Sequence, residues 1–329
     1  MVCGQTETNE AFVDIKHLKK YFNVHKGLLH AVDDVTLTIP KGKTLGLVGE
    51  SGCGKSTLGR VVIGLIEATG GEVLFDGEDA LKFNKEQRSE FRKRAQIVFQ
   101  DPFSSLNPRM SVSQLIAEPL LINKACSDKK EMDVKIKTLM DTVGLAERLA
   151  TSFPHELDGG RRQRIGIARA LALDPEFIVL DEPVSALDVC IQAQILNLLG
   201  DLQRDRDYTY LFISHDLSVV RYVSDEVAVM YLGQVVEKAG NTVLFKEPLH
   251  PYTQALLSAV PVIDLDNKNK RILLEGDVPS PINPPSGCRF AGRCAYRQEI
   301  CQKETPTLTE IEPGHFVSCH FTRHLERHK

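Results

Sequence analysis

The sequence predicts an α/β fold of the phosphate-loop (P-loop) type, with an inserted helical subdomain and a small C-terminal extension. An apolar strand at residues 45–48 leads into a glycine-rich loop and then into a helix at 58–65. A second apolar strand, at 177–180, ends in two carboxylates. Between these strands, residues 111–149 carry a helical pattern, which favours an all-helical insertion.

The glycine-rich loop has the residue types and spacing of a phosphate-binding loop. Several backbone N–H groups must converge on a phosphate chain, and three glycines let the main chain wrap closely at the positive end of the next helix. Lys55 supplies the charge for the β- and γ-phosphates, and Ser56 is the expected hydroxyl ligand of Mg²⁺. We expect a nucleoside triphosphate to be bound by Gly49, Glu50, Ser51, Gly52, Cys53, Gly54, Lys55, Ser56 and Thr57.

Polar side chains follow three further strands, at the edge where ligands bind to an open parallel sheet. Asp181 is expected to hold Mg²⁺, directly or through water, and Glu182 to polarise the attacking water. Gln100 ends another strand and could reach a metal-bound water, although a polar residue there is often only part of a turn. His215 lies where a γ-phosphate contact is expected, although a lone histidine is usually structural.

The other expected elements surround these motifs. Tyr21 and Phe22 lie between the first two strands, and the local sequence leaves open whether an aromatic stacks on a base or lies in the core. Gly159 and Gly160 precede a helix expected at 165–172 and would expose N–H groups to an anion. The remaining strands are expected at 12–15, 35–39, 71–75, 95–100 and 210–214, and the remaining helices at 85–93 and 191–203.

The composition excludes several classes of protein. The 329 residues carry a net charge of -4 and no basic field of the kind that nucleic-acid binders show, so no nucleic-acid partner is expected. No apolar run approaches the ~20 residues needed to cross a bilayer, and residues 1–9 lack a signal-peptide core. We therefore expect a soluble globular protein whose membrane role comes through a partner. Eight cysteines without a secretory signal favour a reducing compartment.

The order of these motifs resembles the nucleotide-binding subunit of an ABC transporter, over about residues 12–260. The resemblance implies an ATPase that works in head-to-tail pairs, in which ATP lies between the phosphate loop of one chain and the signature loop of the other. It implies that Tyr21 stacks on adenine and that His215 is the switch histidine. The resemblance also implies that Gln100 is the Q-loop sensor, at the place where the transmembrane partner binds. The signature loop is then 157–161, with Asp158, Gly159 and Gly160 facing the partner's ATP, and the D-loop is 185–188.

Four stretches narrow the resemblance to the oligopeptide/dipeptide importers, whose relatives also carry nickel chelates and other small cargoes. They are residues 99–109, 181–189, 250–253 and 276–281. The expected assembly contains a second related ATPase, two transmembrane permeases and an external substrate-binding protein, with this chain peripheral on the cytoplasmic face of the membrane. The expected domains are an ATPase cassette at 8–262, with a helical subdomain at about 103–164, and an extension at 263–329.

Two other functions remain as alternatives. A soluble ABC ATPase acting on DNA or ribosomes usually shows tandem cassettes, long coiled coils or a basic field, and none of these is visible in the sequence. An efflux ATPase is disfavoured by the C-terminal extension. Co-purification with a substrate-binding protein would separate import from efflux.

The signature loop departs from the family pattern Leu-Ser-Gly-Gly-Gln. Asp158 replaces the serine and Arg161 the glutamine. A serine hydroxyl donates to the γ-phosphate, whereas an ionised carboxylate has no donor and repels phosphate. Arg161 could offset that charge by pairing with Asp158 or with phosphate. The sequence therefore predicts asymmetric ATP sites in a heterodimer.

Four of the cysteines gather in the last part of the chain. Cys288, Cys294, Cys301 and Cys319 are separated by five, six and seventeen residues, wider than the short pairs of zinc knuckles. Four thiolates suit zinc and an iron–sulfur cluster equally, and free thiols in a small core are the third possibility. The resemblance to importer ATPases, some of which hold such clusters, favours a [4Fe-4S] cluster. We expect it to be structural or redox-sensing, because it lies outside the ATP motifs.

Overall fold

A computed structural model describes residues 11–260 and 271–322 of the chain. The chain divides into two compact units, and each is described here by itself. The described part of the first unit contains Pro40–Lys43 and Lys82–Leu211, and the second contains Ala11–Ile39, Thr44–Leu81 and Phe212–Lys329 apart from its undescribed residues. The expected boundary between cassette and extension, at 262 and 263, lies outside the described residues.

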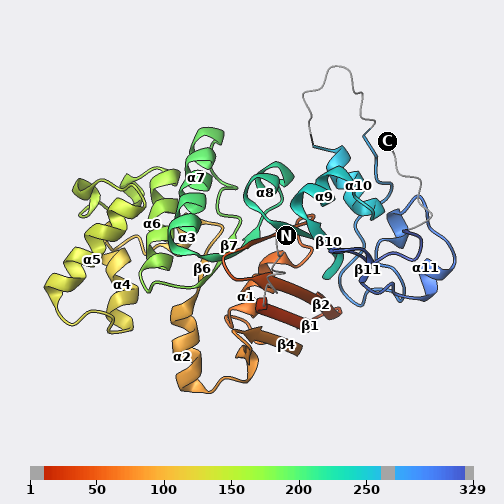
Figure 1. The fold of residues 1–329 in the computed structure, drawn as a ribbon, viewed down its shortest axis with the longest axis horizontal. Helices are drawn as coiled ribbons and strands as arrows, with labels where there is room; N and C mark the ends of the chain where they lie inside the picture. The colour runs from red at the N-terminus through yellow and green to blue at the C-terminus, as the bar shows by residue number, and fades with distance from the viewer. Residues whose placement is uncertain (1–10, 261–270, 323–329) are drawn as a thin grey trace, which may run out of the picture. The chain divides into compact units, whose positions relative to one another are not determined.

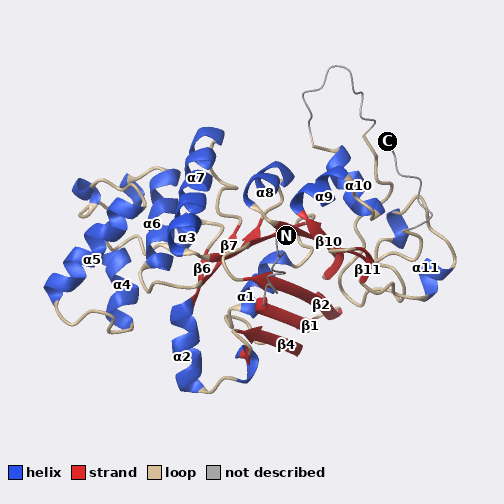
Figure 2. Ribbon diagram, viewed as in Figure 1, coloured by secondary structure: helices blue, strands red, loops and turns tan. Residues whose placement is uncertain are grey.

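The second unit contains an antiparallel sheet with the strand order β2-β1-β4-β5 (Figure 2). Alternate residues of β2, Val35, Leu37 and Ile39, are buried, as the period of a strand requires. One expectation was wrong: Tyr21 lies inside the first strand and not between two strands, because that strand continues to a tight turn at residues 25 and 26. The four strands are β1 (Ala11–Val24), β2 (Gly27–Pro40), β4 (Gly70–Phe75) and β5 (Glu78–Asp79).

The same unit holds the strand that precedes the phosphate loop. All residues of β3 (Thr44–Val48) are buried, as in a parallel strand covered on both faces, and β3 pairs in parallel with β9 (Glu226–Tyr231). The order continues through β10 (Gln234–Gly240) and β12 (His315–Val317) to β11 (Thr309–Glu312), all antiparallel. The helices are α1 (Lys55–Val62), α8 (Leu217–Val223), α9 (Asn241–Lys246), α10 (Pro251–Ser258) and α11 (Ile300–Lys303).

The first unit places β6 (Ala95–Val98) parallel to β7 (Phe177–Asp181), and β8 (Thr209–Ile213), whose residues are divided between the units, follows β7 in the strand order. Its α6 begins at Gly159 and not at the expected residue 165, because Asp158 caps it. The helices are α2 (Lys85–Arg94), α3 (Pro102–Ser105), α4 (Val112–Ile122), α5 (Lys129–Thr142), α6 (Gly159–Leu171) and α7 (Val189–Arg206).

The insertion between β6 and β7 is helical, as the sequence predicted. Helices α4, α5 and α6 lie against one another (Figure 1). Their contact buries apolar side chains from all three helices, at the spacing of an amphipathic helix face. These side chains are Leu115, Ile116, Leu120, Ile136, Leu139, Met140 and Ile165.

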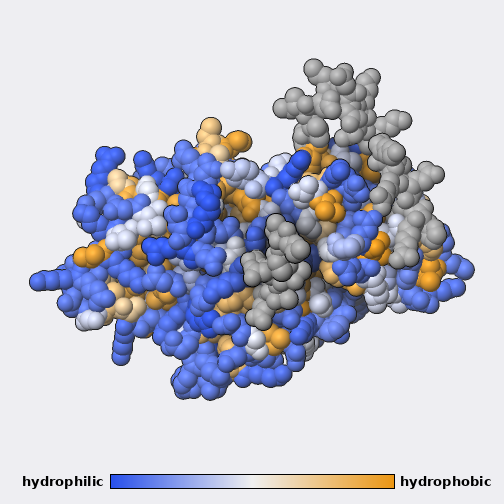
Figure 3. Space-filling model, viewed as in Figure 1, coloured by the Kyte–Doolittle hydropathy of each residue, from blue (hydrophilic) through white to orange (hydrophobic). Residues whose placement is uncertain are grey.

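Hydrophilic side chains dominate the face drawn in Figure 3, with hydrophobic ones scattered among them. Among the residues that the structure describes, no helix combines the length and the apolar character needed to cross a membrane.

Candidate functional site

The phosphate loop joins β3 to α1 and owes its path to glycine. Gly49 has φ of 153°, and a Cβ there would lie 2.1 Å from the carbonyl oxygen of Met230. Gly54 has φ of 107°, and a Cβ there would lie 2.0 Å from the carbonyl oxygen of Ala31. Neither position tolerates a side chain. Gly54 is also the N-cap of α1, so the first turn, with Ser56 and Thr57, presents its N–H groups without a capping side chain.

The side chain of Lys55 folds back onto the phosphate loop. Its Nζ atom donates to the carbonyl oxygens of Gly49, at 2.8 Å, and Glu50, at 3.0 Å, and the residue is buried. Cys53 lies beside it, and burial raises the pKa of the Cys53 thiol although the charge of Lys55 acts in the opposite direction. Ser51 and Gly52 are exposed at the tip. The ammonium group is therefore held at the mouth of an anion-binding loop.

The first unit brings Gln100 and Glu182 together. The Nε2 atom of Gln100 donates to Oε2 of Glu182 over 2.8 Å. The contact follows from topology, because each residue comes two positions after the last paired residues of neighbouring parallel strands, Val98 and Leu180. Asp181 is fully buried. Glu182 has φ of 49°, a left-handed conformation that costs a non-glycine residue about 1–3 kcal/mol and is concentrated at functional sites.

The predicted signature loop has a well-defined local structure. Asp158 Oδ1 accepts the N–H of Arg161 over 2.8 Å, and Arg161 Nη1 lies 3.3 Å from Asp158 Oδ2. The arginine therefore pairs with the carboxylate, one of the two arrangements left open by the sequence. A Cβ on Gly160, in the first turn of α6, would lie 2.5 Å from Ile191 Cγ2 near the start of α7, so a larger residue there would require Ile191 to move.

Tyr21 lies in β1 and faces two residues that the sequence did not single out. Its hydroxyl donates to Asp33 Oδ1, and its ring lies 4.2 Å from the ring of His30, tilted by 32°. Burial and the hydrogen bond to Asp33 raise the pKa of Tyr21. His215, in contrast, follows β8 and is exposed.

The four clustered cysteines line one pocket. Its other walls include the rings of Phe290, Tyr296 and His250, and its empty volume is about 370 Å³ with open solvent included. Burial is the main cause that raises the pKa of the Cys288 thiol to about 11; the neighbouring cysteines act in the same direction and a backbone hydrogen bond acts against it. The side chains of the described residues form no group of three or more histidines, cysteines or carboxylates arranged to hold a metal ion.

Sequence reasoning gave no contact role to Asp33, Tyr252 and Arg293, which contact Tyr21 and Glu50, or to Arg289, which contacts Asp33. Tyr252 lies in the family stretch 250–253, whereas the other three lie in no motif and only their contacts identify them. The early start of α6, in contrast, could have been predicted, because an aspartate before a helical pattern is an N-cap signal.

Two family models match the chain. The model described as ABC transporter matches residues 32–185, and the model described as oligopeptide/dipeptide transporter, C-terminal region, matches residues 236–301.

Curated relatives match almost end to end. The oligopeptide transport ATP-binding protein AppF of Bacillus subtilis is 50% identical over 321 residues, which cover 94% of this chain and 97% of AppF. OppF of Haemophilus influenzae, with the same description, is 50% identical over 93% of this chain and 92% of its own length. Among solved structures, the ATP-binding cassette MJ0796 bound to ADP and Pi is 28% identical with a TM-score of 0.64, covering 70% of this chain and 98% of that one.

Proposed function

Because the chain belongs to the ATP-binding subunits of oligopeptide ABC transporters, we propose that it hydrolyses ATP to power the import of oligopeptides or a related small cargo. The observation that carries the proposal is the presence of both family regions, cassette and oligopeptide-type C-terminal region, in one chain. The near-complete coverage of relatives at about half identity supports the same function.

We assign the site residues by their types and local geometry. The phosphate loop binds the phosphates, with Lys55 at the β- and γ-phosphates and Ser56 at Mg²⁺. Asp181 is the second Mg²⁺ ligand, since carboxylate and hydroxyl oxygens suit this hard cation, and Gln100 contacts it through water. Glu182 acts as general base. Tyr21 stacks on adenine and His215 contacts the γ-phosphate; Asp158, Gly159 and Gly160 face ATP held by the partner subunit.

The proposed assembly contains a second related ATPase, two permeases and an external substrate-binding protein, with this chain peripheral at the cytoplasmic face. We also propose residues 8–262 as the ATPase cassette and residues 263–329 as the C-terminal extension. The test is uptake of a labelled oligopeptide by proteoliposomes carrying the full assembly. Uptake that requires ATP and the substrate-binding protein, and that is lost with Lys55→Ala, supports the proposal. ATP-driven export, or an ATPase that co-purifies with ribosomes and no permease, would support an alternative function.

We further propose that the two ATP sites of the pair are unequal. Asp158 offers no hydroxyl donor to the γ-phosphate, and its pairing with Arg161 offsets the negative charge without restoring that donor. The site containing Lys55 and Glu182 would then carry most of the hydrolysis, if the partner subunit supplies an ordinary serine.

We propose that Cys288, Cys294, Cys301 and Cys319 hold a [4Fe-4S] cluster. The proposal rests on the position of the four cysteines around one pocket and on the family resemblance; the described side chains are not themselves arranged as a metal-binding group, so the sulfur atoms would have to move together when the cluster binds. Such a cluster would crosslink the extension and make it sensitive to oxidation.

Anaerobically purified protein should be brown, with a broad absorbance near ~400 nm and equal amounts of iron and sulfide. Cys294→Ser should lose the colour, whereas Cys190→Ser, at an exposed site in the first unit, should keep it. Colourless protein with stoichiometric zinc would contradict the cluster and keep a four-cysteine metal site. Metal-free protein with four titratable thiols would contradict both.

A further inference from the structure

The segment between the first two clustered cysteines reaches the predicted nucleotide-binding residues. Cys288 and Cys294 enclose Arg289, Phe290 and Arg293, and each of these three side chains is largely buried. All of the contacts described below lie within the second unit. The cysteine cluster was expected to be structural or redox-sensing because it lies outside the ATP motifs, so these contacts add a role that the sequence did not indicate.

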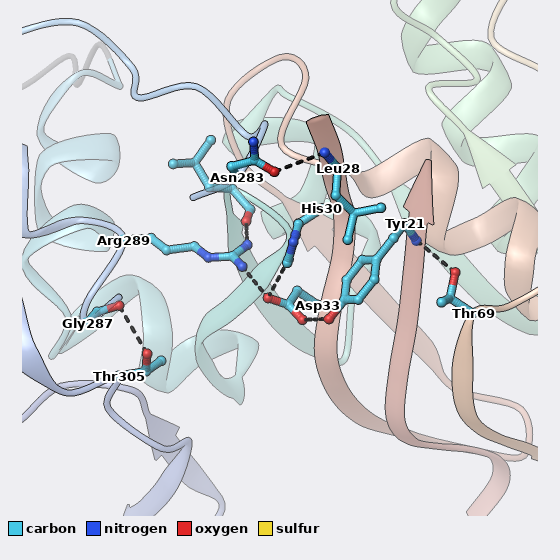
Figure 4. A network of polar contacts seen from close by, with 10 residues as sticks. Tyr21, Leu28, His30, Asp33, Thr69, Asn283, Gly287, Arg289 and Thr305 are labelled. Carbon is cyan, nitrogen blue, oxygen red and sulfur yellow. Dashed lines mark hydrogen bonds and ion pairs between the residues drawn. The ribbon is translucent and has the colours of Figure 1, made fainter. Parts of the chain in front are cut away.

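Arg289 contacts Asp33, the carboxylate that also accepts the hydroxyl of Tyr21. Its Nη2 atom donates to Asp33 Oδ2 (Figure 4). Its Nη1 atom donates to the carbonyl oxygen of Leu232. The other oxygen of Asp33 accepts the hydroxyl of Tyr21, and His30 Nδ1 lies 3.3 Å from Oδ2. The side chains of Arg289 and Asp33 are only 6% and 15% exposed. A buried arginine fork therefore fixes a carboxylate that in turn fixes the aromatic ring.

The ionisation of Asp33 follows from these partners. Burial alone would raise the pKa of Asp33, but the hydrogen bond from Tyr21 and the charge of Arg289 outweigh it and lower the pKa. The carboxylate is thus charged, and it depends on Arg289 for its compensating charge. Without the arginine, the carboxylate would keep only the hydrogen bond from Tyr21 and the contact with His30.

Arg293 acts on the phosphate loop. Its Nη1 atom lies 2.9 and 3.1 Å from the two carboxylate oxygens of Glu50. The backbone of Glu50 is also held, since its N–H donates to the hydroxyl of Tyr252 over 3.0 Å and its carbonyl accepts Nζ of Lys55 over 3.0 Å. Phe290 packs against Tyr252, with ring centroids 5.5 Å apart, and also lines the cysteine pocket. Glu50, whose carbonyl oxygen accepts Lys55, is therefore bound through its carboxylate to the segment between Cys288 and Cys294.

We propose that Arg289 and Arg293 are positioning residues of the nucleotide site, with different parts of the nucleotide as their targets. Arg289 acts through Asp33 on Tyr21 and so on the base, whereas Arg293 acts through Glu50 on the loop that binds the phosphates. This division rests on the proposed ATP site. It also means that nucleotide binding and the conformational stability of the segment between Cys288 and Cys294 are coupled. Such a coupling is reciprocal, so bound nucleotide should stabilise the segment as the segment stabilises the bound nucleotide.

The test compares a ligand that has a base with one that has none. Affinities of the full-length protein for Mg²⁺-ATP and for Mg²⁺ with inorganic tripolyphosphate are measured by calorimetry. Arg289→Met should weaken ATP binding about tenfold, as expected when a charge-assisted hydrogen bond that orders a binding residue is lost, and should change tripolyphosphate binding less than about twofold. Arg293→Met should weaken both ligands. Arg289→Lys, which keeps the charge but not the fork, should give an intermediate ATP affinity.

The matched control is Arg297→Met, because Arg297 is an exposed arginine three residues beyond Cys294 and its change should leave both affinities as in the wild type. Equal weakening of ATP and tripolyphosphate by Arg289→Met would show a general structural role and overturn the proposal, as would unchanged ATP binding. The proposed function fails separately: in that case the wild type binds no ATP, or Lys55→Ala binds it as well as the wild type does.

A second measurement needs no variant that could fail to fold. The amide N–H of Cys288 donates to the carbonyl oxygen of Cys301 over 2.8 Å, and that of Ala291 to Cys288 over 3.0 Å. Hydrogen exchange at these amides should slow when Mg²⁺-ATP saturates the wild-type protein, and should respond less to tripolyphosphate. Exchange that is indifferent to ATP would overturn the coupling.

Discussion

The amide of Gln100 donates to the carboxylate of Glu182 over 2.8 Å, which joins the ends of two neighbouring parallel strands. The hydrogen bond restrains the side chain of the proposed general base through a residue that the family resemblance places at the transmembrane partner. A movement of Gln100 would therefore free or reorient the carboxylate. This relationship gives a physical route between the partner and the chemistry of hydrolysis.

Glu182→Gln should trap bound ATP. The amide keeps the size of the side chain but cannot accept a proton, so hydrolysis should fall by about 10²- to 10⁴-fold, the usual contribution of a general base. Nucleotide affinity should stay close to that of the wild type. The measurement is ATP turnover and ATP retention in the assembled transporter, and undiminished turnover would remove Glu182 from this role.

Lys55→Ala should abolish nucleotide binding or hydrolysis. Its ammonium group is held by two carbonyl oxygens of its own loop and is lost with the side chain. Each charge-assisted hydrogen bond contributes about 1.5–3 kcal/mol, so loss of one lowers ATP affinity roughly ten- to a hundredfold, and loss of those to both the β- and γ-phosphates should leave no measurable binding. Fluorescent nucleotide titration measures this, with Lys41→Ala as the control at an exposed lysine of the first unit. Wild-type affinity in the Lys55 variant would contradict the assignment.

Asp158→Ser should raise turnover at the ATP site of the partner subunit. Serine supplies the missing hydroxyl donor and remains a good N-cap for α6, so the helix should keep its stability. Asp158→Gly removes the charge without adding a side-chain donor and so separates the two effects, since glycine is a tolerated N-cap. Site-resolved turnover in the heterodimer is the measurement. If both sites of the unmodified pair already turn over equally, the asymmetry does not exist.

Glu237→Ala should destabilise the second unit by roughly 3–5 kcal/mol, the usual result of removing one member of a buried pair. Both Glu237 and His315 are buried, and Nε2 of His315 lies 2.7 Å from Glu237 Oε1. The same carboxylate accepts the N–H groups of Leu249 and His250. Urea unfolding measures the loss, and Glu310→Gln on the exposed neighbouring strand should cost little. A loss below about 1 kcal/mol would contradict this account.

The phosphate loop, the two strand-end carboxylates and the helical insertion could be predicted because their signals are local. Gly49 and Gly54 occupy backbone conformations that other residues avoid, and a short apolar strand followed by polar residues indicates a ligand edge wherever it pairs. The limits of individual elements differed from those expected. The first strand continues through Tyr21, and α6 starts with its aspartate cap, because pairing and capping extend elements beyond their apolar patterns.

The sequence by itself determined the family, the phosphate loop and the departure at Asp158, because these depend on residue identity at fixed spacing. Only the tertiary structure decided that Arg289 reaches Asp33 and that Arg293 reaches Glu50, across 256 and 243 positions of the chain. Such contacts leave no periodic pattern, since each depends on how distant segments pack. The physical reason is burial: a buried carboxylate requires a cation, and the fold supplies it from the segment that carries the cysteines.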